Sequence, residues 1–320
     1  MIKRYSVIFV VFFTTFTFYQ TALPYDLPPV NLGFTSFVDG APPPAGPGFY
    51  FTQYVQYYAS DKLEDGPPGH QVNALVGATQ IFYQSDTPAI FGAKWGLDAI
   101  LFYADFDVKP ANSPYLQENS SGIGDLLVGP YLQWDPIMGE NGPVFMHRVE
   151  FQMMIPTGKY SDQFELNPGS NVFSFDPYWA ATLFLKPSWT LSWRLHYLWN
   201  AKNDDPSIRT RGAIQFARPD LAVNNIQAGQ AVHLNYATAY EVIPNRFRLG
   251  LNGYYLKQTT DTKVDGQKVS GRREEVFAIG PGAVWHFSPK THLYFNLYFE
   301  TSAQNRPKGD RWNVRFLHHF

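Results

Sequence analysis

Apolar and polar residues alternate one by one along much of this chain. In residues 290–300, Leu293 and Phe295 lie on one face of an extended backbone, while Tyr294 and Asn296 lie on the other. Neighbouring side chains of a β-strand point to opposite sides, whereas a helix repeats its apolar residues every three to four positions. The pattern therefore predicts an all-β chain.

The runs that show this alternation are separated by connections of two lengths. We place about twelve runs, at 49–58, 71–84, 94–106, 123–134, 144–155, 171–185, 190–199, 228–241, 246–257, 274–287, 291–300 and 311–320. The connections after odd-numbered runs are long, at 59–70, 107–122, 156–170, 200–227, 258–273 and 301–310. Those after even-numbered runs are shorter, at 85–93, 135–143, 186–189, 242–245 and 288–290. Long loops on one side and short turns on the other are typical of outer-membrane barrels.

The two faces of the runs differ in chemistry, and this difference predicts how the sheet closes. One face is apolar, with Trp and Tyr near the strand ends, and the other carries Arg, Glu, Asn and His. An unpaired backbone group in hydrocarbon costs several kcal/mol, so an open sheet edge is not viable there. We therefore predict a transmembrane antiparallel β-barrel of about twelve strands, in the outer membrane of a Gram-negative bacterium, with a lumen between that of small barrels and porins.

The N-terminus has the features of a signal peptide. Lys3 and Arg4 precede a short apolar run, Val7–Tyr19, and cleavage near Ala22 is expected. A transmembrane helix is the alternative, but the run is too short for one and prolines follow it. We predict a signal peptide at 1–22, a Pro/Gly-rich segment at 23–48 in or against the lumen, and the barrel at 49–320.

Composition excludes several classes of function. The net charge of −2 gives no sign of the basic surface with which proteins bind nucleic acid. The chain has no cysteine, which excludes disulfides, thiol catalysis and cysteine-based metal sites. Aromatic residues make up 17% of the chain, yet its mean hydropathy is −0.25, as expected when apolar and polar residues alternate.

The polar face supplies candidates for the lining of a pore. Both signs of charge occur, so no strong selection by charge is expected. The alternative for each residue is that it pairs across strands and only holds the wall together. The candidates are Asp125, Arg148, Glu150, Arg194, His196, His233, Glu241, Arg246, Arg248, Glu300, Arg311 and Arg315.

The sequence offers no clear catalytic, cofactor or metal site. His70 with Asp61, Glu64 and Asp65 is the one cluster of catalytic residue types in a loop, and a solvated loop explains it better. The Thr-Gly-Lys at 157–159 lacks the upstream glycine of a phosphate-binding loop. The eight histidines form no HExxH motif, and we expect no metal ion and no cofactor.

Five segments carry motifs of a known family. They are LPPVNLGFTSFVDG at 27–40, GIGDLLVGPYLQW at 122–134, VEFQMMIPTGKYS at 149–161, NPGSNVFSFDPYWAATLF at 167–184 and IGPGAVWHFSPKTHLYFNLYFET at 279–301. In this order they resemble the outer-membrane family labelled for the meta-pathway of phenol degradation. The resemblance implies a twelve-stranded channel for small hydrophobic or aromatic molecules, with the N-terminal segment in or against the barrel.

These observations lead to one function and two alternatives. We expect a monomeric channel for passive uptake of a small organic solute, and not an enzyme. The last strand ends in Phe320 and resembles the signal read by the barrel-assembly machinery, so that machinery and outer-membrane lipid are the expected partners, and nucleic acid is not. The alternatives are an outer-membrane enzyme, such as a lipase or protease, and a structural or adhesive barrel without an open pore.

Overall fold

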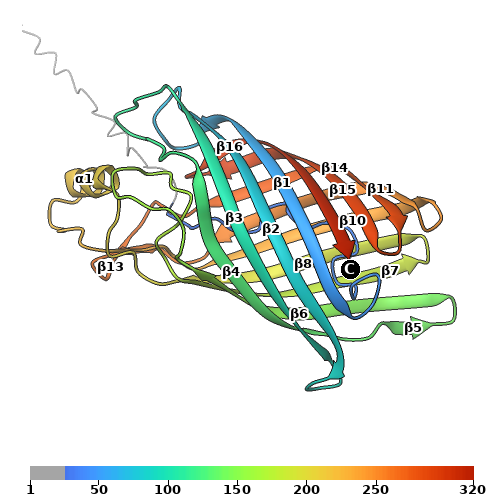
Figure 1. Ribbon diagram of the computed structural model, residues 1–320. Coiled ribbons are helices and arrows are strands. Elements are labelled where there is room, and N and C mark those ends of the chain that lie inside the picture. Colours follow the sequence, from blue (N-terminus) through green and yellow to red (C-terminus); the bar gives the residue numbers. More distant parts are fainter. Residues whose placement is uncertain (1–25) are drawn as a thin grey trace, which may run out of the picture.

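The computed structural model describes residues 26–320, which form a closed antiparallel β-barrel (Figure 1). Twelve long strands make the wall: β1 (Gly48–Leu63), β2 (Gln71–Pro88), β3 (Lys94–Lys109), β4 (Gly122–Gln133), β6 (Gly142–Ile155), β7 (Ser174–Lys186), β8 (Trp189–Asn200), β10 (Ala231–Ile243), β11 (Phe247–Gln258), β14 (Glu275–Ser288), β15 (Thr291–Gln304) and β16 (Pro307–His319). The predicted fold class and strand number are confirmed. The predicted signal peptide, residues 1–22, lies outside the described residues.

The barrel closes where its first strand meets its last. β1 pairs antiparallel with β16, from Tyr50 opposite His319 to Leu63 opposite Pro307, and pairing of β4 with β6 completes the ring. Each wall strand therefore has two neighbours, and the wall presents no long unpaired edge to the membrane.

The alternation in the sequence matches the two faces of the wall. In β8, Trp189 and Leu191 are exposed on the outer surface, while Thr190 and Ser192 are buried on the inner one. The outward residues form an apolar belt, as a lipid-facing surface requires. Among residues 26–320, the single helix is too short and too polar to span a membrane.

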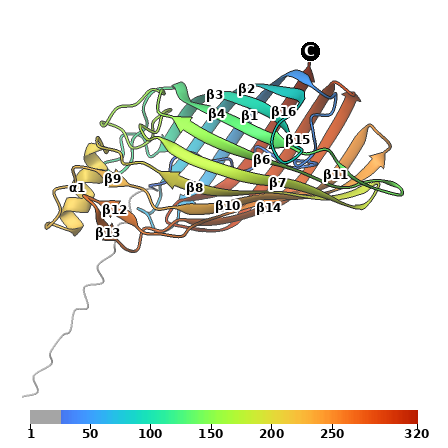
Figure 2. The ribbon, with the colours of Figure 1, turned by 90° about the horizontal axis from the view of Figure 1, so that it is seen from below.

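The two ends of the barrel differ. At the loop end, the connection after β8 contains helix α1 (Ile208–Ala217) and β9 (Ile226–Gln227), which pairs with the hairpin of β12 (Thr262–Val264) and β13 (Gln267–Val269) (Figure 2). Ser207 caps α1 by accepting a hydrogen bond from the amide of Thr210. The opposite, turn end carries short connections and the C-terminus (Figure 1). In outer-membrane barrels the loop end faces outward.

Two predicted connections differ from the structure. The predicted long loop 301–310 is wrong, because β15 and β16 continue to a turn at Asn305 and Arg306. Asn305 has a positive φ of 53°, which a tight turn requires and which asparagine tolerates. The predicted turn 135–143 contains a short strand, β5 (Ile137–Gly139), which pairs back onto β6.

Residues 26–47, here called the inner segment, run within the ring of strands from the loop end to the turn end. The Asp26 carboxylate pairs with Arg272 at the loop end. Further along, the amide of Gly33 donates to Asn235 (2.8 Å) and the amide of Gly40 donates to Thr182 (3.0 Å). Wall side chains thus satisfy a backbone that has no ladder of its own.

Candidate functional site

Two cavities lie inside the barrel, one toward each end. The loop-end cavity measures roughly 340 Å³ and is bordered by residues 26–35, and the turn-end cavity measures roughly 780 Å³ and is bordered by residues 37–44. Four wall residues, here called the waist, line both cavities: Tyr54, Gln80, Arg148 and Arg194. The inner segment passes the waist, so the passage between the cavities is set by its contacts there.

An ion pair joins the inner segment to the wall at the waist. Arg194 donates through Nε and Nη2 to the two carboxylate oxygens of Asp39, at 2.7 and 2.8 Å. The guanidinium also lies 4.0 Å from the ring centre of Tyr178. A bidentate, largely buried pair of this kind is strong and directional.

Arg148 lies beside Arg194 at the waist, because Ala180 of β7 pairs with Arg148 of β6 on one side and with Arg194 of β8 on the other. Its Nε donates to Oε1 of Gln133 at 2.9 Å, and its guanidinium lies 4.6 Å from the ring centre of Tyr131. Gln133 in turn donates to the carbonyl of Gly40 at 3.2 Å. The wall therefore binds the backbone of the inner segment as well as its side chain.

Two buried glutamates are enclosed by hydrogen-bond donors. Glu150 accepts from the Tyr178 hydroxyl and from Gln152 (2.8 Å). Glu300 accepts from the hydroxyls of Tyr58 (2.8 Å) and Tyr254 (2.7 Å). These bonds compensate the cost of taking a carboxylate out of water and fix the inner surface of the wall.

Arg311 connects the Glu300 group to the inner segment. Its Nε donates to the Tyr254 hydroxyl and its Nη1 to Gln56, both at 2.9 Å, and it lies 3.7 Å from Glu300. Gln56 then donates to the carbonyl of Leu32 at 3.1 Å.

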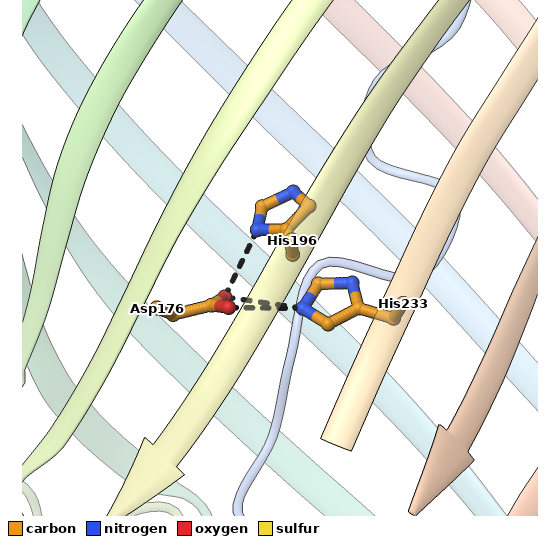
Figure 3. A group of neighbouring side chains, drawn as sticks. All are labelled: Asp176, His196 and His233. Carbon is orange, nitrogen blue, oxygen red and sulfur yellow. Dashed lines mark hydrogen bonds and ion pairs between the residues drawn. The ribbon is translucent and has the colours of Figure 1, made fainter. Parts of the chain in front are cut away.

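Asp176, His196 and His233 converge on the inner face of three adjacent strands, β7, β8 and β10 (Figure 3). Nδ1 of His196 lies 3.1 Å from the Asp176 carboxylate, and Nε2 of His233 lies 3.1 and 3.2 Å from its two oxygens. The imidazole rings stack with their centres 4.0 Å apart. The aspartate also borders the loop-end cavity.

In this triad one carboxylate, that of Asp176, accepts hydrogen bonds from both histidines. A carboxylate only accepts, so both imidazoles carry a proton on the nitrogen that faces Asp176. Their other nitrogens, Nε2 of His196 and Nδ1 of His233, are buried without a hydrogen-bond partner among the described residues. Two histidines and one aspartate are also ligand types of a zinc ion, but a ligating histidine normally donates its second N–H to an oriented acceptor, which both rings lack here.

Asp125 ties the loop after β6 to the wall. It accepts from the amide of Gly158 (2.9 Å) and from the amide of Ser170 (2.8 Å). Gly158 and Gly169 pack backbone to backbone, so that a Cβ on Gly158 would lie 2.7 Å from the Cα of Gly169. The Thr-Gly-Lys and Asn-Pro-Gly-Ser segments thus serve close packing.

At the loop end, Glu274 anchors the start of the inner segment. It accepts from the amide of Leu27 (2.9 Å) and pairs with Arg306 (3.4 Å). Burial raises the pKa of Glu274 to about 8, although the Arg306 charge opposes this shift.

A family model described as "Putative MetA-pathway of phenol degradation" matches residues 46–316. The chain belongs to this family. A comparison with curated proteins gave no significant match. The matched region includes all of the wall strands except the last residues of β16.

Solved structures share the architecture of this family member. The COG4313 outer membrane channel from Pseudomonas putida F1 is 18% identical, with a TM-score of 0.71 over 92% of this chain and 100% of that one. The β domain of the Bordetella autotransporter BrkA is 10% identical, with a TM-score of 0.47 over 86% and 100%. The CymD monoaromatic hydrocarbon channel is 7% identical, with a TM-score of 0.39 over 87% and 91%. The first of these likenesses establishes the outer-membrane barrel fold, and the other two are too weak to bear on function.

The structure places the predicted pore-lining residues of this family member unevenly. Arg246 lies exposed in the turn before β11, since that strand begins one residue later than predicted. The others point inward, and most are engaged by partners: Asp125, Arg148, Glu150, Arg194, His196, His233, Glu241, Arg248, Glu300, Arg311 and Arg315. Whether they line a path for solute stays a prediction.

The solvated loop predicted for the His70 cluster is wrong for His70 itself. His70 is buried, and its ring nitrogens lie 2.7 Å from the Ser113 hydroxyl and 3.2 Å from the carbonyl of Pro68. The Ser113 oxygen also accepts from the amide of Tyr115 (3.1 Å), as a turn-capping serine does.

Sequence reasoning missed two important acidic residues. Asp39 lies in the aperiodic inner segment, where no pattern marks it. Asp176 lies within the predicted run 171–185, on the inward side with Ser174 and Tyr178, so the alternation itself could have identified it.

Proposed function

We propose that this outer-membrane barrel is a passive channel for small organic molecules, apolar and aromatic ones included. The observation that carries the proposal is the pair of cavities on either side of the waist, lined by a mixture of apolar and polar side chains. Cavities of a few hundred Å³ with this mixed lining suit small organic ligands.

The inner segment controls the passage in this proposal. It borders both cavities, and the Asp39–Arg194 pair ties it to the waist. A solute larger than water then passes only when this part of the segment shifts. The predicted division into an N-terminal segment, 23–48, and a barrel, 49–320, fits this role. The barrel strands would form a fixed wall, and the segment would change position within it.

The transport step involves no chemistry. The Asp176 triad holds histidines and a carboxylate but no nucleophile, and no carboxylate of residues 26–320 hydrogen-bonds to the His70–Ser113 pair. Covalent catalysis needs a nucleophile activated by an oriented base. We also propose that the chain acts as a monomer and that its assembly uses the exposed Phe320 after β16.

Uptake into liposomes tests the proposal. Liposomes with the refolded protein should swell in isotonic solutions of small aromatic and aliphatic solutes faster than in solutions of a disaccharide. Asp39→Asn should increase this rate, because Arg194 loses its charged partner and the inner segment is released. Asp105→Asn, which removes an exposed carboxylate on β3, is the matched control and should leave the rate unchanged.

Two results would contradict the channel. Folded wild-type protein that gives neither swelling nor current in a planar bilayer would favour a structural barrel. Hydrolysis of phospholipid or peptide that is lost in His70→Ala would favour an enzyme.

A further inference from the structure

Arg315 is a buried guanidinium without a carboxylate partner. It lies on the inward face of β16 and is 7% exposed, and its Nε has no hydrogen-bond partner in the described structure. Arg194, Arg248 and Arg311 all pair with carboxylates, whereas no carboxylate of residues 26–320 lies within ion-pair distance of Arg315.

The neighbours of Arg315 compensate its charge only in part. Its guanidinium lies 3.7 Å from the ring centre of Tyr294 and 6.0 Å from that of Tyr54. A cation–π contact of this kind offsets only part of the cost of burying an unpaired charge. Asp39 faces the same cavity, but Arg194 occupies both of its oxygens.

The cavity around Arg315 has a surplus of positive charge. Five arginines and only two carboxylates line it. Both carboxylates are engaged, because Asp39 binds Arg194 and Glu241 binds Arg248 at 3.2 Å. The histidines of this cavity, His286 and His292, bond to each other through Nδ1 at 2.6 Å.

Apolar side chains complete the same cavity. Phe37 comes from the inner segment, and Phe82 and Leu317 come from β2 and β16. Leu317 lies two residues after Arg315 on the same face of β16, so the cavity offers a charged side chain next to an apolar one.

We propose that the turn-end cavity binds a small organic carboxylate, with its anionic group at Arg315 and its apolar body along Phe37, Phe82 and Leu317. This proposal rests on the proposed channel function and names the class of solute that the channel favours. The planar guanidinium can donate two parallel hydrogen bonds to a carboxylate, so the site should bind a carboxylate more tightly than a neutral analogue of the same shape.

Calorimetric titration of the full-length, detergent-solubilised protein tests the site with three probes. Sodium benzoate has both features, benzamide lacks the charge, and sodium acetate lacks the apolar body. Benzoate should bind about tenfold more tightly than benzamide, because a charged carboxylate makes stronger hydrogen bonds to a guanidinium than a neutral amide does. It should also bind about tenfold more tightly than acetate, because acetate buries much less apolar surface. Equal affinity for benzoate and benzamide would overturn the role of charge, and equal affinity for benzoate and acetate would overturn that of the apolar wall.

Variants assign the binding to Arg315. Arg315→Gln should weaken benzoate binding about tenfold or more, and Arg315→Lys should weaken it less because the charge remains. Lys290→Gln removes a positive charge from an exposed turn at the same end and should leave the affinity unchanged. Benzoate binding that is the same in wild type and Arg315→Gln would overturn the proposal.

Folding and transport are measured separately. The heat-modifiable mobility of a folded barrel on a gel checks each variant, and the comparison of probes on wild type stands even if Arg315→Gln does not fold. Absence of current from wild type in a planar bilayer defeats the channel. If the wild type conducts current but Arg315→Gln binds benzoate as tightly as the wild type does, the carboxylate site is refuted and the channel proposal stands.

Discussion

At the scale of single residues, the inner surface is a set of polar groups that nearly all have partners. Glu150 and Glu300 each accept from tyrosine hydroxyls, and Asp39 binds Arg194 through both oxygens. Such pairing is required where a wall has little water, because an unpaired buried polar group costs free energy. Arg315 stands out in this set because its guanidinium contacts tyrosines and no carboxylate of residues 26–320 lies within ion-pair distance of it.

Replacing Asp176 tests whether the histidine pair depends on its shared acceptor. Asp176→Ala removes the acceptor of two buried imidazole N–H groups, and each unsatisfied donor costs about 1–3 kcal/mol. We expect a loss of about 2–4 kcal/mol in the free energy of unfolding, measured by urea denaturation in lipid vesicles. Asp105→Ala on the exposed surface is the control, and an equal effect in the two variants would refute the role of the triad.

A glycine-to-alanine change tests the packing below the loop after β6. A Cβ at Gly158 would lie 2.6 Å from the backbone carbon of Gly124, which cannot move without the wall. Gly158→Ala should cost about 1–3 kcal/mol of stability and make residues 156–173 easier to cleave with protease. Gly212→Ala on α1 meets open space and should be neutral or slightly stabilising, so the same cleavage rate in both would contradict this account.

At the scale of elements, the wall strands and the inner segment depend on different interactions. The strands satisfy their backbone with each other, whereas the segment relies on wall side chains such as Asn235, Thr182 and Gln133. No β-ladder joins the two, so the backbone pairing of the wall does not depend on the segment.

Glu274 makes the loop-end anchor sensitive to pH. Burial raises its pKa to about 8 in the folded protein, above the ordinary glutamate value of 4.5, so the folded state keeps a proton that the unfolded state loses between these values. Stability from this group is thus present below pH 4.5 and is lost as pH rises through 8. Protease cleavage within residues 26–35 should be faster at pH 9 than at pH 6, and Glu274→Gln should remove most of this difference. A pH dependence that persists in Glu274→Gln would disprove the assignment.

At the scale of the whole molecule, the barrel separates three environments. An apolar belt faces lipid, a surplus of arginine faces the turn-end cavity, and the small sheet of β9, β12 and β13 with α1 covers part of the loop end. Ring closure between β1 and β16 is what keeps these environments apart.

A charge on the lipid face should be costly in proportion to its depth. Leu195 lies near the middle of β8 with 42% of its surface exposed on the outer side. Leu195→Arg should lower the free energy of unfolding in vesicles by about 2–4 kcal/mol. Ile208→Arg, on exposed α1 outside the wall, should change it little, and a similar loss in both would show that the outer face of β8 does not lie in the membrane.

The periodicity of the sequence by itself determined the strand number, the fold class and the inner face of those strands for which it placed residues in the lumen, apart from Arg246. Each of these follows from the local rule that successive side chains of a strand point to opposite sides. The loop 301–310 was predicted wrongly because β15 and β16 extend beyond the strongly alternating part, and the short strands β9, β12 and β13 are too short to show a period.

Only the tertiary structure decided what the interior does. Asp39 meets Arg194 across 155 positions of the chain, and the aperiodic inner segment gives no local sign of this contact. The charges that appear balanced along the sequence separate once the barrel closes, which leaves Arg315 without a carboxylate beside an apolar wall. Pairing between distant residues depends on closure and on the path of the segment, and no local pattern encodes either of them.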